Sequence, residues 1–163
     1  MTRNTQHTAQ PEMTPLQQRS AEIEVAAAFL SALEERLGKD QAAEVFDDVV
    51  RSLAHAAAER FREQFPDPTL SDLWAVWGIL GGEGRLDLAL EELTDTTLRF
   101  RVDRCEYADM YRAKGLEQAG VAFSCRRDAP FARAFLPGVE VEQSTSILEG
   151  GEYCAFTYTL EEK

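Results

Sequence analysis

Three cysteines in the second half of the chain are the residues whose type and position best suit chemistry. Cys105 follows an expected strand at Leu98–Arg104 and begins a segment with helical character. A junction between a strand and a helix offers free backbone N–H groups, which lower the pKa of a thiol and bind anionic groups. We therefore predict a reactive thiol at Cys105. Cys125 is expected on a short helix, and Cys154 shares the alternation of the apolar residues on the last strand and should face the core.

The same three cysteines allow two other interpretations. Free cysteine is among the most buried residue types, and all three could be small core residues. Alternatively, Cys105, Cys125 and Cys154 could bind a divalent metal such as zinc, although the sequence has neither a close C-x-x-C pair nor a cluster of histidines. A Cys–His dyad would require His55, which falls on an expected structural helix. The sequence leaves the cofactor open.

Acidic side chains near the cysteines could move protons. Glu106, Asp109, Asp128 and Glu149 all lie within the segments that carry the cysteines. A carboxylate that the fold brings into a pocket can act as a general base. These four residues are therefore candidates for that role.

The first half of the chain must supply helices that hold these residues in place. Residues 1–13 are polar and without periodicity, so we expect a flexible tail there and a single domain over residues 14–163. Thr14-Pro15-Leu16-Gln17 has the pattern of a helix N-cap, and apolar residues at helical spacing continue to Leu37, just before Gly38. A second helix is expected from about Asp40 until Pro66, with Val45, Val49, Leu53, Ala57 and Phe61 near one stripe and Phe46 and Val50 beside it. The short connection favours an antiparallel helical hairpin.

A third, shorter helix is expected to begin after Thr69 or Ser71. It contains Trp74 and Trp77, three residues apart, which are expected in the core. The run Gly81-Gly82-Glu83-Gly84 ends this helix. Because the run lacks the lysine of a P-loop and the G-x-G-x-x-G spacing, it predicts a helix stop and not a phosphate site.

The hydrophobic period then changes from 3.6 to 2, which marks the start of a sheet. Leu86–Leu90 and Leu98–Val102 are expected to form a first hairpin. Short helices should follow up to about Phe135, with breaks near Gly115, Asp128 and Pro130, and a second hairpin should occupy residues 139–160. This order predicts an α+β fold: an N-terminal helical hairpin plus short helices packed on an antiparallel sheet of about four strands.

The charge balance excludes several partners. With 29 acidic and 17 basic residues, the chain carries a formal charge of −12, which repels phosphate backbones and anionic lipids. The longest apolar run, Val25–Leu30, is too short to span a bilayer, and no signal-peptide pattern is present. We therefore expect a cytoplasmic protein with reduced thiols, a small molecule as substrate or ligand, and neither nucleic acid nor membrane as partner. A homo-oligomer remains open.

Three segments resemble a known family. Arg104–Tyr111, Cys125 with Asp128, and Glu149–Phe156 are similar to the corresponding motifs of L-2-amino-thiazoline-4-carboxylic acid hydrolases, and the matching stretch covers roughly residues 86–160. The resemblance implies a hydrolase that opens the 2-amino-thiazoline ring to give N-carbamoyl-L-cysteine. The chain differs in having Gln143 where the family often has a basic residue and Ala155 where an aspartate commonly follows the last cysteine.

The leading hypothesis is hydrolysis of a C–N or C–S bond in a small cyclic amidine. In it, Cys105 or Cys154 acts as nucleophile, and Asp128 or Glu106 positions water or moves a proton. The residues assigned to substrate binding are Arg104, which would hold a carboxylate, together with Tyr107, Tyr111 and Cys125. The alternative is a non-enzymatic module for a small molecule or a metal, because the chain also resembles the vinyl-4-reductase and TRAPP-like fold.

Overall fold

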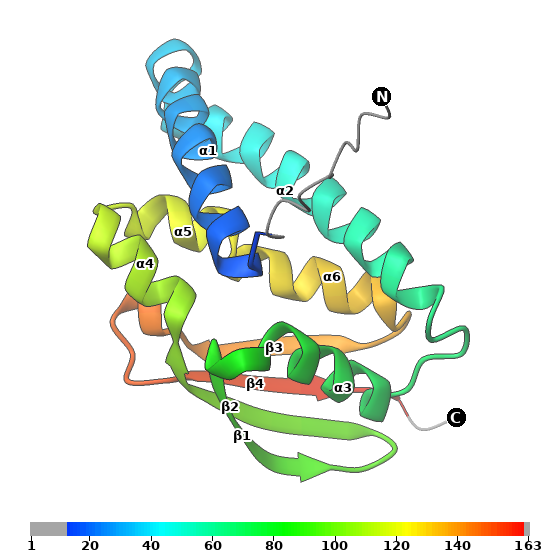
Figure 1. Ribbon diagram of the computed structural model, residues 1–163. Helices are drawn as coiled ribbons and strands as arrows, with labels where there is room; N and C mark the ends of the chain where they lie inside the picture. Colours follow the sequence, from blue (N-terminus) through cyan, green and yellow to red (C-terminus); the bar gives the residue numbers. More distant parts are fainter. Residues whose placement is uncertain (1–12, 162–163) are drawn as a thin grey trace, which may run out of the picture.

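The computed structural model describes residues 13–161, in which helices cover one face of a four-stranded antiparallel sheet (Figure 1). The α+β class is confirmed. The helices are α1 (Pro15–Leu37), α2 (Lys39–Arg62), α3 (Leu70–Leu80), α4 (Glu106–Lys114), α5 (Glu117–Phe123) and α6 (Asp128–Phe135), and the strands are β1 (Leu86–Leu93), β2 (Thr97–Cys105), β3 (Glu140–Thr145) and β4 (Cys154–Thr159). Three short 3₁₀ turns are η1 (Gly82–Gly84), η2 (Cys125–Arg127) and η3 (Ile147–Glu149). The expected tail, except Met13, lies outside the described residues.

The N-terminal helices form the predicted hairpin. Thr14 caps α1, since its hydroxyl accepts from the backbone N–H of Gln17 while the Gln17 side chain accepts from the backbone N–H of Thr14. Gly38, with φ of 82°, turns the chain directly into α2. No helix among the described residues has the length and apolar character needed to cross a membrane.

The apolar stripe of α2 is rotated from the predicted one. Val45, Val49 and Leu53 remain 43%, 52% and 42% exposed. The face that packs against α1, α5 and α6 contains Ala42, Phe46, Val50, Ala54 and Ala58, which are all buried. Tertiary packing has therefore selected the stripe with small residues, because alanines allow neighbouring helices to approach closely. Both stripes satisfy helical spacing, so periodicity alone did not distinguish them.

The sheet has the order β1-β2-β4-β3, so the two predicted hairpins join through antiparallel pairing of β2 with β4. Opposite Val102 on β2 lies Cys154 on β4. The buried residues of these two strands are Leu98, Phe100, Val102, Cys154, Phe156 and Tyr158. They form one apolar surface, as their alternation predicted. The cysteine at the end of β2 and the cysteine at the start of β4 therefore lie near the same end of the sheet.

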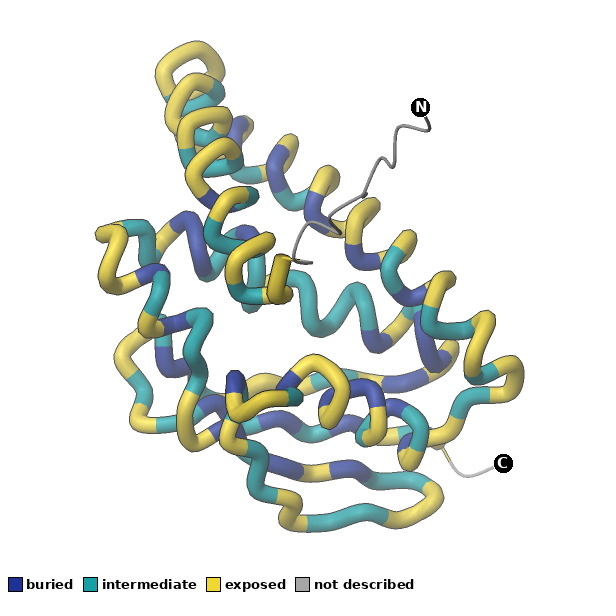
Figure 2. Tube along the Cα trace, in the orientation of Figure 1, coloured by how far each residue is buried: buried dark blue, intermediate teal, exposed yellow. Residues whose placement is uncertain are grey.

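Helices cover that apolar surface in two layers (Figures 1 and 2). α3 packs on β1 and β2, and α6 packs on β3, while α2 lies over α6. From α3, the Trp77 ring centroid lies 5.0 Å from those of both Phe100 and Phe156. This aromatic cluster fixes α3 on the centre of the sheet.

The predicted short helices between the hairpins are α4, α5 and α6, with the η2 turn before α6. α4 ends at Gly115, as expected. The break expected near Asp128 is confirmed, because α6 begins at this residue, but the chain does not break at Pro130, which lies in the first turn of α6. The first backbone N–H groups of a helix have no partner within it, so a proline there removes no hydrogen bond.

Candidate functional site

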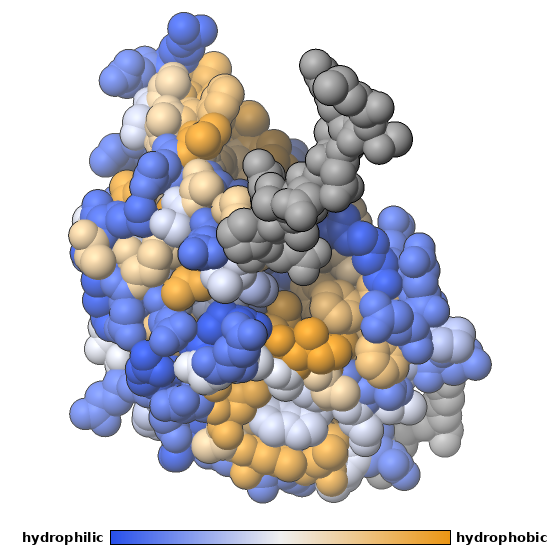
Figure 3. All heavy atoms as spheres, viewed as in Figure 1, coloured by the Kyte–Doolittle hydropathy of each residue, from blue (hydrophilic) through white to orange (hydrophobic). Residues whose placement is uncertain are grey.

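A cavity of about 190 Å³ lies between the helical layers and the end of the sheet where β2 finishes and β4 begins. Its lining comes from every helix except α5, from all four strands, and from the η2 and η3 turns. Apolar side chains such as Phe61, Trp77, Val102, Phe131 and Phe156 make up much of the wall. On the face drawn in Figure 3, hydrophobic residues gather over α3 and the nearby strands, whereas hydrophilic residues cover the outer side of α2.

All three cysteines line this cavity, but none has a lowered pKa. Burial raises the pKa of Cys105 to about 11 and outweighs the backbone N–H groups of Ala108 and Tyr107, which act in the opposite direction. Burial also raises the thiol pKa of Cys125 and of Cys154. The prediction of a low-pKa thiol at Cys105 is therefore wrong. The helix N–H groups are present, but desolvation at the sheet end is the larger effect.

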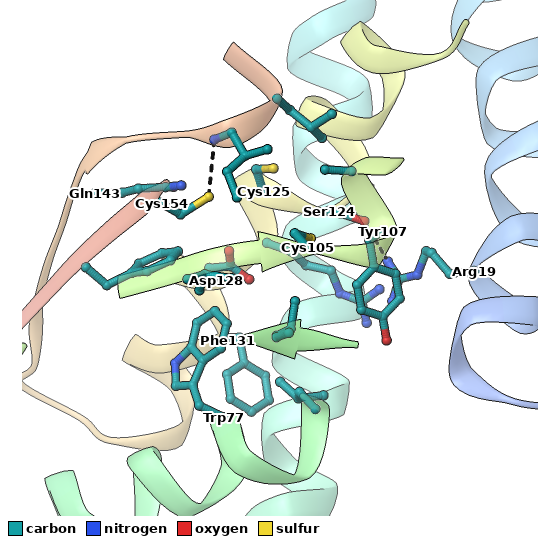
Figure 4. Close-up of a pocket in the computed structure, with 18 of the residues that line it drawn as sticks. Arg19, Trp77, Cys105, Tyr107, Ser124, Cys125, Asp128, Phe131, Gln143 and Cys154 are labelled. Carbon is teal, nitrogen blue, oxygen red and sulfur yellow. Dashed lines mark hydrogen bonds between the residues drawn. The ribbon is translucent and has the colours of Figure 1, made fainter. Parts of the chain in front are cut away.

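Cys154 has the best-defined donor to its sulfur. The backbone N–H of Ile147 donates to its Sγ at 3.3 Å, drawn as a dashed line in Figure 4. The side chains of Ser146 and Gln143 also act to lower the Cys154 pKa, although burial dominates. Donors of this kind favour the thiolate over the thiol. Of the three sulfurs, that of Cys154 is the best prepared to carry negative charge.

The loop before β4 creates this arrangement. Ile147–Glu149 forms η3, and the backbone N–H of Gly151 then donates to the Ser146 carbonyl oxygen at 2.8 Å. A Cβ atom at Gly151 would lie 2.9 Å from that oxygen, so the loop closes tightly only with glycine at this position. The closed loop aims the Ile147 N–H at Cys154. The Gly150-Gly151 pair of the sequence motif therefore has a positional role.

Asp128 supplies a carboxyl group to the same cavity. It is the first residue of α6 and follows Cys125–Arg127 directly. Desolvation raises its pKa to about 7, even though Arg127 and Arg19 act to lower it. A carboxyl group with a pKa near 7 is partly ionised at neutral pH and can both accept and return a proton. Asp128 and Cys154 are labelled near each other in Figure 4.

Tyr107 and Tyr111 also line the cavity, at the four-residue spacing expected along α4. Tyr111 is fully buried, and its hydroxyl is hydrogen-bonded to Ser124. Burial raises the pKa of Tyr111 to about 12 and also raises that of Tyr107. Both phenols are therefore neutral and can act as hydrogen-bonding walls.

Two of the predicted site residues lie outside the cavity lining. Arg104 is 49% exposed at its side chain and pairs with Glu106 at 3.0 Å. Arg104 also donates to the carbonyl oxygen of Gly84. A register shift between Asp87 and Leu88, opposite this end of β2, interrupts the alternation, so Cys105 faces the cavity while Arg104 points to solvent, where it pairs with Glu106. The structure therefore assigns neither the carboxylate anchor nor the proton transfer to this pair.

Several lining residues were missed by the sequence analysis. Arg19 extends from α1 toward Tyr107 and Ser124 in Figure 4, and Arg127 lines the cavity from η2. Gln143 lies close to Cys154 in the same view. Arg127 is adjacent to Asp128 in sequence and could have been found from that neighbour. Arg19 had no local signal, because its hydrogen bond to Ser124 spans 105 residues.

The three sulfurs do not make a metal site by themselves. Among residues 13–161, no group of three or more histidine, cysteine, aspartate or glutamate side chains is arranged to hold a metal ion. The zinc interpretation therefore gains no support from the geometry.

A second hollow, of about 170 Å³, adjoins the first. Both are lined by Cys125, Asp128, Gln143 and Phe156, which thus form a shared wall. The second hollow is completed by Val121, Arg126, Ala129, Val141 and Glu149. Asp128 therefore borders both hollows.

Comparison with solved structures supports the fold. The phenol-responsive sensory domain of the transcription activator PoxR, in a crystal structure with phenol, is 11% identical with a TM-score of 0.55, over 91% of this chain and 77% of that one. A trafficking protein particle complex subunit 3 from Naegleria fowleri, covalently bound to palmitic acid, is 9% identical with a TM-score of 0.53, over 89% and 96%. At such identities the likeness concerns the fold alone.

Comparison with sequences gives the family. Among curated proteins, no relative matches the chain. A family model described as L-2-amino-thiazoline-4-carboxylic acid hydrolase matches residues 18–158. This match extends well beyond the C-terminal motifs, from the first turn of α1 to the end of β4, and it includes all the cavity-lining residues named above. The chain therefore belongs to the L-2-amino-thiazoline-4-carboxylic acid hydrolase family.

Proposed function

We propose that the protein is a hydrolase that opens a C–S or C–N bond of a small cyclic amidine, with Cys154 as nucleophile and Asp128 as the acid–base group. The observation that carries the proposal is the combination of a thiol held by the Ile147 N–H at 3.3 Å and a carboxyl group of pKa about 7 in one desolvated cavity. Family membership supports a hydrolase, and the family's name supports 2-amino-thiazoline-4-carboxylate as the first substrate to test.

The raised thiol pKa values define how the reaction begins. At rest Cys154 is protonated, so a base must take its proton as the sulfur attacks. In the proposed sequence, the Asp128 carboxylate accepts this proton while Sγ adds to the amidine carbon. The ring C–S bond then breaks, and the departing sulfur takes the proton from Asp128. The product of this half-reaction is an isothiourea that joins Cys154 to the opened substrate.

The second half-reaction releases the enzyme. Asp128 removes a proton from water, and the resulting hydroxide adds to the same carbon. The bond to Cys154 breaks, and the thiol recovers its proton from Asp128. The sum is addition of one water and formation of a ureido group and a free thiol, which for the thiazoline acid gives N-carbamoyl-L-cysteine. The second hollow beside Asp128 offers a route for this water.

The test is turnover of L-2-amino-thiazoline-4-carboxylic acid, followed by mass detection of the ureido product and by appearance of free thiol. We expect Cys154→Ser and Asp128→Asn to lower kcat by about a thousandfold or more, as is typical when one member of a nucleophile–base pair is removed. Iodoacetamide labelling with peptide mapping should also find that the substrate protects Cys154. Unchanged turnover in Cys154→Ser would contradict the assigned nucleophile.

The second candidate is a binding module without chemistry. It is favoured by the raised pKa of all three thiols and by the apolar wall around Trp77 and Phe131. The ligands in the two structures of similar fold, phenol and palmitic acid, are consistent with an apolar cavity that serves binding. In that case, calorimetry should detect binding of the thiazoline acid with no product after prolonged incubation.

A further inference from the structure

The cavity has an unusual charge for this protein. The chain as a whole carries a formal charge of −12. In contrast, the charged side chains that line the cavity, among the described residues, are Arg19, Arg127 and Asp128. Because the pKa of Asp128 is about 7, the lining carries between one and two net positive charges at neutral pH. The lining is therefore positive within a strongly negative molecule, and although Glu22 beside Arg19 offsets part of this charge, Arg127 has no such ion pair among the described residues, so the site should favour an anion.

Arg127 is the less satisfied of the two arginines. Its side chain makes no hydrogen bond or ion pair within the part of the chain that the structure describes, and it is partly buried. Desolvation lowers its pKa, and the positive charge of Arg19 acts in the same direction. The other charged groups that act on it are Glu22 and Asp128, which raise the pKa, and Arg60, which lowers it. A desolvated cation next to another cation is unfavourable until an anion joins them.

Arg19 is held in position for such an anion. Its Nη1 donates to Ser124 Oγ at 3.3 Å, its Nε lies 3.4 Å from Glu22, and its guanidinium carbon lies 5.0 Å from the centre of the Phe123 ring. These contacts fix the guanidinium at the side of the cavity near Tyr107 (Figure 4). Asp128, Gln143 and Cys154 lie on the opposite side in that view.

We propose that Arg19 and Arg127 form an anion clamp that binds a carboxylate of the substrate and sets its reacting carbon toward Cys154. The proposal rests on the proposed hydrolysis for the identity of the reacting group, but not for the clamp itself. The sequence analysis assigned the carboxylate anchor to Arg104. The proposal assigns this role instead to Arg19 in α1 and Arg127 in η2. The planar fork of arginine suits a carboxylate, since it can donate two parallel hydrogen bonds.

The clamp also defines a substrate class. The ligand must carry a carboxylate at one end and the reacting amidine at the other, with a flat apolar body between them that fits beside Trp77 and Phe131. A volume of about 190 Å³ lies below the ~300–1,000 Å³ that is usual for drug-sized ligands. The class is therefore a compact heterocyclic carboxylic acid. Neutral amidines and long-chain acids fall outside it.

The experiment compares two probes that the enzyme cannot open, the aromatic compounds 2-aminothiazole-4-carboxylate and 2-aminothiazole-4-carboxamide. Calorimetry with the full chain should give at least roughly tenfold tighter binding of the carboxylate, because charge-assisted hydrogen bonds to it are lost in the amide. Arg127→Gln and Arg19→Gln should each weaken carboxylate binding by roughly 10- to 100-fold and leave amide binding within about twofold. Arg127→Lys keeps the charge but lacks the planar fork. Its affinity for the carboxylate should fall between that of wild type and that of Arg127→Gln.

Two further arginines provide matched controls. Arg126 adjoins Arg127 but is exposed, pairs with Asp47 and lines the second hollow instead of the cavity, and Arg104 lines neither. Arg126→Gln and Arg104→Gln should keep the preference for the carboxylate. A wild-type protein that binds both probes equally, or an Arg104→Gln variant that loses the preference while Arg127→Gln keeps it, would overturn the clamp. If binding depends on Arg127 as expected but no thiazoline is hydrolysed, the clamp stands and the proposed hydrolase function fails.

Discussion

At the scale of single residues, Asp128 couples stability to function through one pKa. The pKa of this carboxyl group is raised from an ordinary value of 3.8 to about 7 because the folded chain desolvates it. The folded state therefore holds its proton between these two pH values, whereas the unfolded state loses it. In this window the contribution of Asp128 to the free energy of unfolding falls as pH rises. Above pH 7 the folded state bears the full cost of an ionised, desolvated carboxylate. The same ionisation produces the carboxylate that the proposed reaction needs as its base.

Asp128→Asn tests this coupling. The variant cannot ionise at this position, so its free energy of unfolding should rise relative to wild type by on the order of 4 kcal/mol between pH 4 and pH 8. Urea titrations of both proteins at several pH values in this range give the difference directly, and other titrating groups cancel. Parallel curves for the two proteins would show that the carboxyl group ionises as easily when folded as when unfolded.

At the scale of elements, the loop between β3 and β4 matters most for the site. η3 and the glycine pair that follows carry the Ile147 N–H to the Cys154 sulfur, and the close approach at Gly151 leaves no room for a side chain. The obstructing atom is a backbone oxygen, which cannot rotate away as a flexible side chain would. A methyl group at this position must therefore open the loop.

We expect Gly151→Ala to lower the free energy of unfolding by about 1–3 kcal/mol, as overpacking usually does. It should also lower turnover, because the donor to Cys154 moves. Gly78→Ala is the matched control: a Cβ at Gly78 meets nothing within 4 Å, and this exposed position is in α3. Since alanine favours a helix over glycine by ~1 kcal/mol, this control should be more stable than wild type. Equal stability of the two variants would argue against a closed loop.

Most of the helices and strands could be predicted from the sequence. The capping pattern at Thr14 and the change of hydrophobic period after Gly84 are local signals, so the helical hairpin and both β-hairpins could be predicted. Which apolar stripe of α2 would be buried could not be predicted, because the two stripes differ only in the helices that they contact. The site could be predicted in part. Cys105, Cys125 and Cys154 reach one cavity, but this depends on β2 pairing with β4, which local patterns do not encode.

The arginines illustrate the same limit. Alternation counted from the buried Val102 would have put Arg104 on the core face, and the register shift between Asp87 and Leu88, opposite this end of β2, reverses that order in a way the local pattern does not encode. Arg19 reaches the cavity only because α1 packs against α5 and α4. Contacts between segments so distant in sequence depend on tertiary packing, which single-sequence patterns cannot supply.

At the scale of the whole molecule, an open cavity in the core lowers stability in exchange for binding. Several lining positions carry small residues, and Ala57 on α2 is one of them. Residues selected for packing alone would fill this space, since buried apolar groups stabilise the folded state. Their absence is expected if the cavity is kept for a ligand.

Ala57→Leu should therefore raise the free energy of unfolding by about 1 kcal/mol and weaken binding of 2-aminothiazole-4-carboxylate by at least roughly tenfold. Ala56→Leu, at the adjacent exposed position of α2, is the control and should change stability by less than about 0.5 kcal/mol and leave binding unchanged. Urea unfolding and calorimetry measure the two quantities. Tighter binding in Ala57→Leu would mean that the ligand lies elsewhere.

The position of Trp77 has a practical consequence. Its indole packs on Phe100 and Phe156 and at the same time faces the cavity, so its excited state is sensitive to whatever occupies that space. The sequence contains two tryptophans, and replacing Trp74 with phenylalanine would leave Trp77 as the single emitter. The protein thus contains an intrinsic optical indicator, and the arrival and departure of a ligand can be timed by fluorescence without detecting any product.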